Sequence, residues 1–158
     1  MIKVNVEINN KSWHKKIKNP KQYLNKKLKK VPKIVKFFKD KNITFTILLT
    51  NSINMKKLNK EFRKKNKSTD VLSFPFFSIK NLKLNKKKSF YIGDIAISFE
   101  SINIRSKESN FNSEFDKVWI HGLLHLVGYN HIKNKDYLKM QNIEKIIINS
   151  ISKKKDLN

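Results

Sequence analysis

The stretch from His121 to His131, HGLLHLVGYNH, holds three of the four histidines in the chain. If residues 114 to 127 form a helix, His121 and His125 lie one turn apart on one face, with about 5 to 6 Å between their Cβ atoms. Gly128 is a natural left-handed cap that should end this helix, so a tight turn can fold His131 back toward the other two. The spacing therefore predicts a helix that ends at a cluster of three imidazoles.

Three neutral imidazoles that leave a fourth position open are typical of catalytic zinc, where bound water becomes a hydroxide near neutral pH. The alternative is that His121 and His125 are ordinary core or surface residues and that His131 lies in a loop. The concentration of three histidines at this spacing, in a chain with four, favours the metal site.

The pattern H-x-x-x-H-x-x-G-x-x-H is also the spacing of the metzincin proteases, except that their glutamate is Gly122 here. That glutamate is the general base of the protease, and glycine cannot abstract a proton. A zinc peptidase is therefore disfavoured. Because a glycine within a helix costs about 1 kcal/mol relative to alanine, we expect that substrate or another backbone approaches closely at Gly122.

Upstream of this stretch, two segments alternate apolar and polar residues with period two, which predicts strands at 2–8 and 43–49. Between them an apolar stripe with helical spacing begins after Pro20 and reaches Phe38. Pro32 lies within this stripe and should kink or split the helix.

Further elements are expected on both sides of the histidines. Pro75 lies in the strand expected at 71–77 and places it at a sheet edge or a strand end. The capping pair Ser113 and Asp116 should open the histidine helix. The expected elements are a short helix from the caps Asn51 and Ser52 through Phe62, a strand at 71–77, a Lys-rich loop at 78–90, a strand at 91–99, and a final amphipathic helix through Met140, Ile143, Ile147 and Ile151.

The order of elements predicts an α/β (α+β-like) fold: a single compact domain in which a small mixed sheet of about four strands packs with helices. We expect one domain at 1–152 and a charged C-terminal tail at 153–158. With no cysteine, any metal must use histidine or carboxylate ligands. Neither a signal peptide nor a run of about 18 apolar residues is found, which predicts a soluble, cytoplasmic protein with no membrane partner.

The formal charge of +24 indicates a polyanionic partner such as nucleic acid. Codon drift toward lysine is a competing explanation for part of this excess, and lysines run along the whole chain, so charge alone places no binding face. Against this background Arg63 stands out, because a guanidinium holds phosphate or carboxylate with a planar fork. Asp70, in a turn, and Asp94, inside an apolar strand, are the other unusual polar positions.

The segments STDVLSFP, YIGDIAIS and HGLLHLVGYNH, in this order and at these separations, resemble the YbeY family of bacterial metal-dependent endoribonucleases. The resemblance covers roughly residues 43 to 150. It implies a metal-dependent hydrolase domain with one zinc ion per chain, acting as a single-strand-specific endoribonuclease in 16S ribosomal RNA 3′-end maturation and in ribosome quality control. The implied partners are ribosomal RNA, the small ribosomal subunit and ribosome-assembly proteins.

The resemblance makes His121, His125 and His131 the metal ligands. It assigns Arg63 and His121 to catalysis, with Arg63 as a phosphate or transition-state contact. Asp70, Asp94 and Asn130 are supporting candidates, of which either aspartate could accept a proton. The family usually has Asp where this chain has Asn130; an amide can still form hydrogen bonds but is a poor base. A ribosome-assembly factor with a mainly structural metal is the alternative in another functional class.

Overall fold

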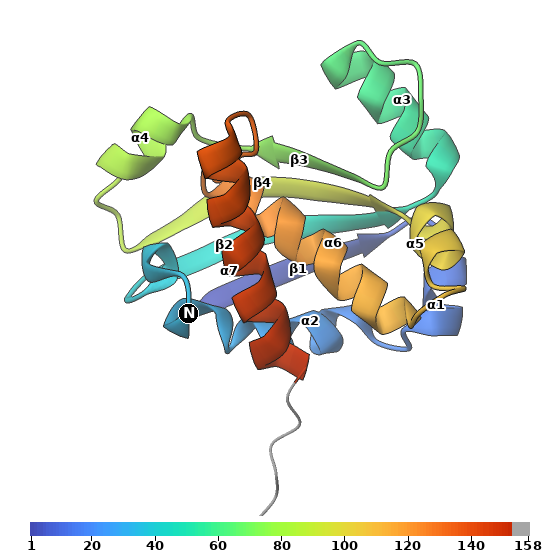
Figure 1. The fold of residues 1–158 in the computed structure, drawn as a ribbon, viewed down its shortest axis with the longest axis horizontal. Helices are drawn as coiled ribbons and strands as arrows, with labels where there is room; N and C mark the ends of the chain where they lie inside the picture. Colours follow the sequence, from blue (N-terminus) through green and yellow to red (C-terminus); the bar gives the residue numbers. More distant parts are fainter. Residues whose placement is uncertain (153–158) are drawn as a thin grey trace, which may run out of the picture.

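Alternation of apolar residues along four segments produces a single four-stranded sheet with the order β1-β2-β4-β3 (Figure 1). β1 pairs with β2 and β2 with β4 in parallel, whereas β3 runs antiparallel to β4. The strands are β1 (Ile2–Ile8), β2 (Asn42–Thr50), β3 (Val71–Pro75) and β4 (Ser89–Ser98). The sheet is therefore mixed, and β3 lies at its edge, as Pro75 predicts, although the strand ends at Pro75 and not at residue 77.

The structure is a computed structural model that describes residues 1–152; the tail expected at 153–158 lies outside the described residues. Short 3₁₀ turns span Val31–Lys33 and Lys36–Phe38. The α-helices within residues 1–152 are α1 (Ser12–Lys16), α2 (Pro20–Leu28), α3 (Ser52–Arg63), α4 (Ile79–Leu84), α5 (Phe99–Arg105), α6 (Phe111–Leu126) and α7 (Asn134–Ser152). In this part of the chain no helix is both long and apolar enough to cross a membrane.

The predicted split of the helical stripe at Pro32 is confirmed: the helix that starts at Pro20 ends at Leu28, and the stripe continues through the two 3₁₀ turns, because Pro32 cannot continue an α-helix. Three other local predictions differ from the structure. The predicted loop at 78–90 contains α4, whose Ser78 cap accepts a hydrogen bond from the Asn81 amide. The strand predicted to reach residue 99 ends at Ser98, where α5 begins. Finally, α6 is capped by Asn110 and not by Ser113.

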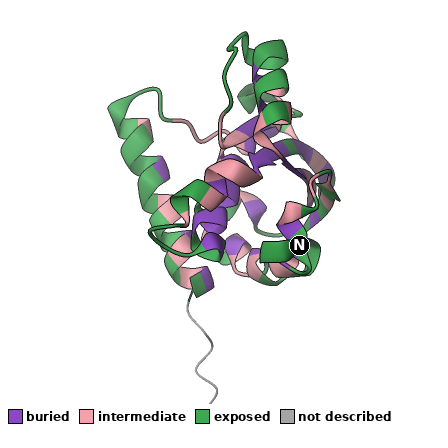
Figure 2. Cartoon of the chain, turned by 90° about the vertical axis from the view of Figure 1, so that its right-hand side faces the viewer, coloured by how far each residue is buried: buried purple, intermediate pink, exposed green. Residues whose placement is uncertain are grey.

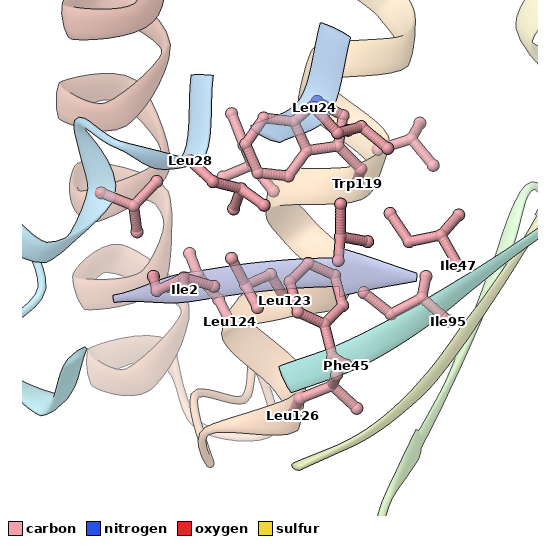
Figure 3. Close-up of a cluster of buried hydrophobic side chains, with 14 of the residues drawn as sticks. Ile2, Leu24, Leu28, Phe45, Ile47, Ile95, Trp119, Leu123, Leu124 and Leu126 are labelled. Carbon is pink, nitrogen blue, oxygen red and sulfur yellow. The ribbon is translucent and has the colours of Figure 1, made fainter. Parts of the chain in front are cut away.

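The main core lies between one face of the sheet and the helices α2 and α6. Figure 3 shows this cluster, in which Trp119 and Leu123 of α6 and Leu24 of α2 pack on Phe45 and Ile95 of the sheet. Burial of a large apolar side chain stabilises a fold by about 1.5–3 kcal/mol. This packing holds α6 across the middle of the sheet (Figure 1).

The opposite face of the sheet is covered in part. Met55 of α3 packs there with Leu72 and Ala96 in a second, smaller cluster. In Figure 2, α7 has its buried and intermediate residues on the side that faces the domain and exposed residues on the other side, while most of α3 is exposed. Residues of α6 and α7 belong to the main core, so a site formed between these helices rests on that core.

Candidate metal centre

Two histidines are positioned by α6 and the third by the turn that follows it. The Asn110 side chain accepts hydrogen bonds from the Asn112 and Ser113 amides and so begins the helix. At the other end Gly128 has φ of +93°, a conformation that suits glycine, and its amide donates to the His125 carbonyl over 3.1 Å. The chain turns sharply there and brings His131 back, as the sequence predicts.

The three imidazoles form one cluster, the histidine triad His121, His125 and His131. One nitrogen of each ring lies within 4.8 Å of one nitrogen of the others. The Nε2 atoms of His121 and His125 are 3.0 Å apart. The first two side chains are half-buried and His131 is exposed. Three nitrogen donors converging on one point at the protein surface fit a zinc ion with a position left open to solvent.

The outward-facing nitrogens of the triad have partners of their own. Glu144 of α7 lies 2.7 Å from His121 Nδ1, and the Tyr129 carbonyl lies 2.9 Å from His125 Nδ1. When each Nδ1–H donates to its oxygen, the proton is fixed on Nδ1, and Nε2 keeps its lone pair for a metal. Helix α7 and the turn after α6 therefore orient the triad.

The protonation of His125 also favours ligation. Burial lowers the pKa of His125 to about 4, helped by the nearby His121, His131 and Arg63 and opposed by the hydrogen bond to Tyr129. An imidazole with so low a pKa is neutral over the physiological range, which is the form that binds a metal. Both the neutral charge of His125 and the positions of the three nitrogens therefore suit a bound metal ion.

Gly122 is explained by close packing of α6 on the sheet. A Cβ atom at this position would lie 2.8 Å from Ile95 Cγ2 and 3.2 Å from Ser73 Oγ. The Ser73 hydroxyl also donates to the Gly122 carbonyl over 3.1 Å. The close approach expected at Gly122 is present, but it is made by side chains of β3 and β4 and not by substrate or another backbone as predicted. It lets the histidine helix lie directly on the sheet.

Arg63 reaches the triad from the last turn of α3. It lines a hollow of about 430 Å³ together with His125, His131 and Asn130. Its guanidinium donates to the Ser73 carbonyl over 3.4 Å. Asn130 uses its side-chain oxygen to accept from the Ile132 amide over 3.2 Å, which stabilises the turn. The structure thus places two of the predicted site residues beside the triad in a single hollow.

The two aspartates lie in different places. Asp70 lines a neighbouring hollow together with His121 and forms an ion pair with Arg105. Asp94 points to the other face of the sheet, where its carboxylate accepts a hydrogen bond from Tyr91 and lines a separate hollow with Glu7. The strand pairing shifts register opposite Asp94, between Thr44 and Thr46, so the strand has a bulge at this position. The structure does not bring Asp94 together with the triad.

Sequence reasoning missed Glu144 and Ser73. Glu144 is one polar residue on an amphipathic helix, and only the packing of α7 on α6 reveals its contact with His121. Ser73 belongs to the segment STDVLSFP, and its hydroxyl fixes the distance between β3 and α6. A pairwise contact between distant segments leaves no signal in a single sequence.

Comparison with known proteins agrees with this geometry. The family model described as Endoribonuclease YbeY matches residues 7–152. The chain is 49% identical over 156 residues to Endoribonuclease YbeY of Pelagibacter ubique, covering 98% of this chain and 99% of that protein. It is 33% identical to Endoribonuclease YbeY of Fusobacterium nucleatum, covering 85% and 83% respectively. The solution structure of TM1509 from Thermotoga maritima matches with a TM-score of 0.59 and 25% identity, over 96% of this chain and 89% of that one. The chain therefore belongs to the YbeY family of endoribonucleases.

Proposed function

We propose that this protein is a zinc-dependent, single-strand-specific endoribonuclease that hydrolyses phosphodiester bonds of 16S ribosomal RNA in the cytoplasm. Its roles would be maturation of the RNA 3′ end and ribosome quality control, with the small ribosomal subunit and ribosome-assembly proteins as partners. The observation that carries the proposal is the joint placement of Arg63 with His125 and His131 around one hollow, with His121 of the same triad 3.0 Å from His125. Membership of an endoribonuclease family supports the same reaction.

The choice of zinc rests on the donors. Three imidazoles and no thiolate suit zinc among the common metals, and the carboxylate and carbonyl behind them raise the basicity of the ligands. One ion per chain would be held by His121, His125 and His131. When bound, zinc supplies a Lewis acid with an open coordination position.

The chain's own residues would bind and orient the RNA. Arg63, at the wall of the hollow, would hold the scissile phosphate and offset the charge that grows on it in the transition state. Phe77 and Tyr129 line the same hollow, and an unpaired base can stack on such rings, whereas a base inside a duplex cannot. This favours single-stranded RNA as the substrate.

Other groups would accept the proton and attract the RNA to the protein. Asp70 lines the adjoining hollow together with His121 and would act as the proton acceptor. The excess of positive charge attracts RNA over long distances, with an affinity that falls as salt rises. Binding should therefore be strong at low ionic strength for any RNA, while cleavage depends on the hollow.

The test compares cleavage of a single-stranded RNA that spans the 16S 3′ end with cleavage of the same RNA annealed to its complement. We expect rapid cutting of the single strand alone. Arg63→Gln should lower kcat about 10²- to 10³-fold, the usual cost of losing one transition-state donor, and leave the zinc content unchanged. Arg63→Lys serves as the matched control that retains the charge and loses the fork. Equal cleavage of single strand and duplex, or an Arg63→Gln variant with wild-type kcat, would argue against the proposal.

A further inference from the structure

A second hollow opens on the other side of His121, between α6 and α7. It has a volume of about 450 Å³ and is floored by apolar side chains, among them Val118 and Ile148. His121 lines this hollow, whereas His125 and His131 line the one that contains Arg63. The two hollows therefore adjoin different members of the histidine triad.

The second hollow has more cations than anions. Arg105, Lys117 and Lys145 line it, against the two carboxylates of Asp70 and Glu144. Both carboxylates are already engaged, since Asp70 pairs with Arg105 and Glu144 contacts His121. The lining side chains carry a formal charge of +1, but Lys117 is offset by Glu114 just outside the lining. Attraction for an anion therefore comes from the donors of Arg105 and Lys145.

Two of the cations have capacity left for a ligand. One terminal nitrogen of Arg105 binds Asp70, which fixes the guanidinium, and the rest of its donors have no hydrogen-bond partner within residues 1–152. Lys145 is exposed and has no ion pair among the same residues. Lys117, by contrast, is held by Glu114 at 2.7 Å. Arg105 and Lys145 are thus the groups available to bind a phosphate.

The identity of the cation at 105 is a second, independent observation. The chain has only two arginines, and each lines one of the hollows beside the triad. Arginine forms two parallel hydrogen bonds to a phosphate, which lysine cannot do. A guanidinium held in place by an aspartate is a better preorganised anion receptor than a mobile lysine.

We propose that the second hollow is a phosphate subsite, in which Arg105 and Lys145 bind the RNA phosphate next to the one that is cleaved. The strand would cross the triad from the Arg63 hollow to the Arg105 hollow. The first hollow contains the rings of Phe77 and Tyr129 and can take a base, whereas no Phe, Tyr or Trp ring lines the second, so it holds the backbone. This inference rests on the proposed function and adds the path of the substrate to it.

The test measures binding of a short single-stranded RNA to the full-length protein by fluorescence anisotropy at several salt concentrations. The double variant Arg105→Gln, Lys145→Gln should lower the salt slope by about 0.7, because the two cations share one phosphate and each lost phosphate contact on a single strand contributes about 0.7. The matched control, Lys33→Gln with Lys36→Gln, removes the same charge from exposed sites that line neither hollow and should leave the slope unchanged.

A neutral methylphosphonate, placed at each RNA position in turn, identifies the phosphate. At one position beside the cleavage site the neutral linkage should weaken binding to the wild-type protein and have no further effect on the variant. Lys145→Gln alone, which breaks no ion pair, should show half the loss of slope and guards against misfolding of the double variant. Equal slopes for variant and control, or additive effects at every position, would overturn the subsite. Binding that behaves as expected without any cleavage would instead refute the proposed nuclease function and leave the subsite intact.

Discussion

Replacement of Glu144 tests whether α7 tunes the metal centre. The carboxylate lies 2.7 Å from His121 Nδ1, and the two side chains are 23% and 32% exposed, so water competes only in part for the contact. Loss of a carboxylate behind a metal-bound imidazole lowers metal affinity by about 10- to 100-fold. This corresponds to about 1.4 to 2.8 kcal/mol. Glu144→Leu should therefore weaken zinc binding by that factor without changing the ligand set.

The conservative variant Glu144→Gln separates the effect of Glu144 on the orientation of His121 from its effect on packing. Glu144→Gln keeps an acceptor for Nδ1–H but loses the charge, and a neutral hydrogen bond is roughly half as strong as a charged one. Losing half of the free energy changes the zinc affinity by the square root of the full 10- to 100-fold factor, so zinc affinity should fall about 3- to 10-fold. Zinc affinity is measured by competition with a chromophoric chelator. Glu108→Gln, an exposed acid that lines neither hollow, is the control. If Glu144→Leu binds zinc as tightly as the wild type, the orienting role is refuted.

Three further predictions concern Gly122, Asn130 and His125. Gly122→Ala should lower the thermal unfolding midpoint, because the contact at 2.8 Å with Ile95 costs about 1–3 kcal/mol and outweighs the helix-propensity gain of about 1 kcal/mol; a raised midpoint would contradict this. Asn130→Asp should tighten zinc binding in the chelator assay, because it adds a negative charge to the hollow that His125 and His131 line; unchanged or weaker binding would exclude that effect. In metal-free protein, His125 takes up a proton at about pH 6.5 in the unfolded state but only at about pH 4 in the folded state. Lowering the pH therefore favours the unfolded state, and the urea midpoint should decrease as the pH falls from about 6.5 to about 4. His125→Gln should flatten that fall, and an equal slope in both proteins would show that another group is responsible.

The strands and the histidine helix could be predicted because their signals are local. Alternation in β1 and β2, the left-handed cap at Gly128 and the one-turn spacing of His121 and His125 each lie within a few residues of sequence. Helix α4 was missed because lysines and asparagines around Leu82 hide the apolar spacing, and its start depends on the Ser78 cap.

The parts of the site that escaped prediction all depend on tertiary packing. The contact of Glu144 with His121 joins two helices, and the Arg105 hollow forms only when α5, α6 and α7 meet. Asp94 looked like a site residue because a carboxylate interrupts an apolar strand. Whether such a residue faces the triad or the opposite side of the sheet depends on register, which β4 sets through its pairing with both neighbours.

Elemental analysis and RNA cleavage on the same preparation, before and after a chelator, test whether the histidine triad holds a catalytic metal. The substrates are single-stranded and structured ribosomal RNA. We expect one zinc ion per chain, cleavage of the single strand that is lost with the metal and returns with added zinc, and neither metal nor cleavage in His125→Ala. Undiminished cleavage by the metal-free protein, or zinc retained by His125→Ala, would contradict this expectation.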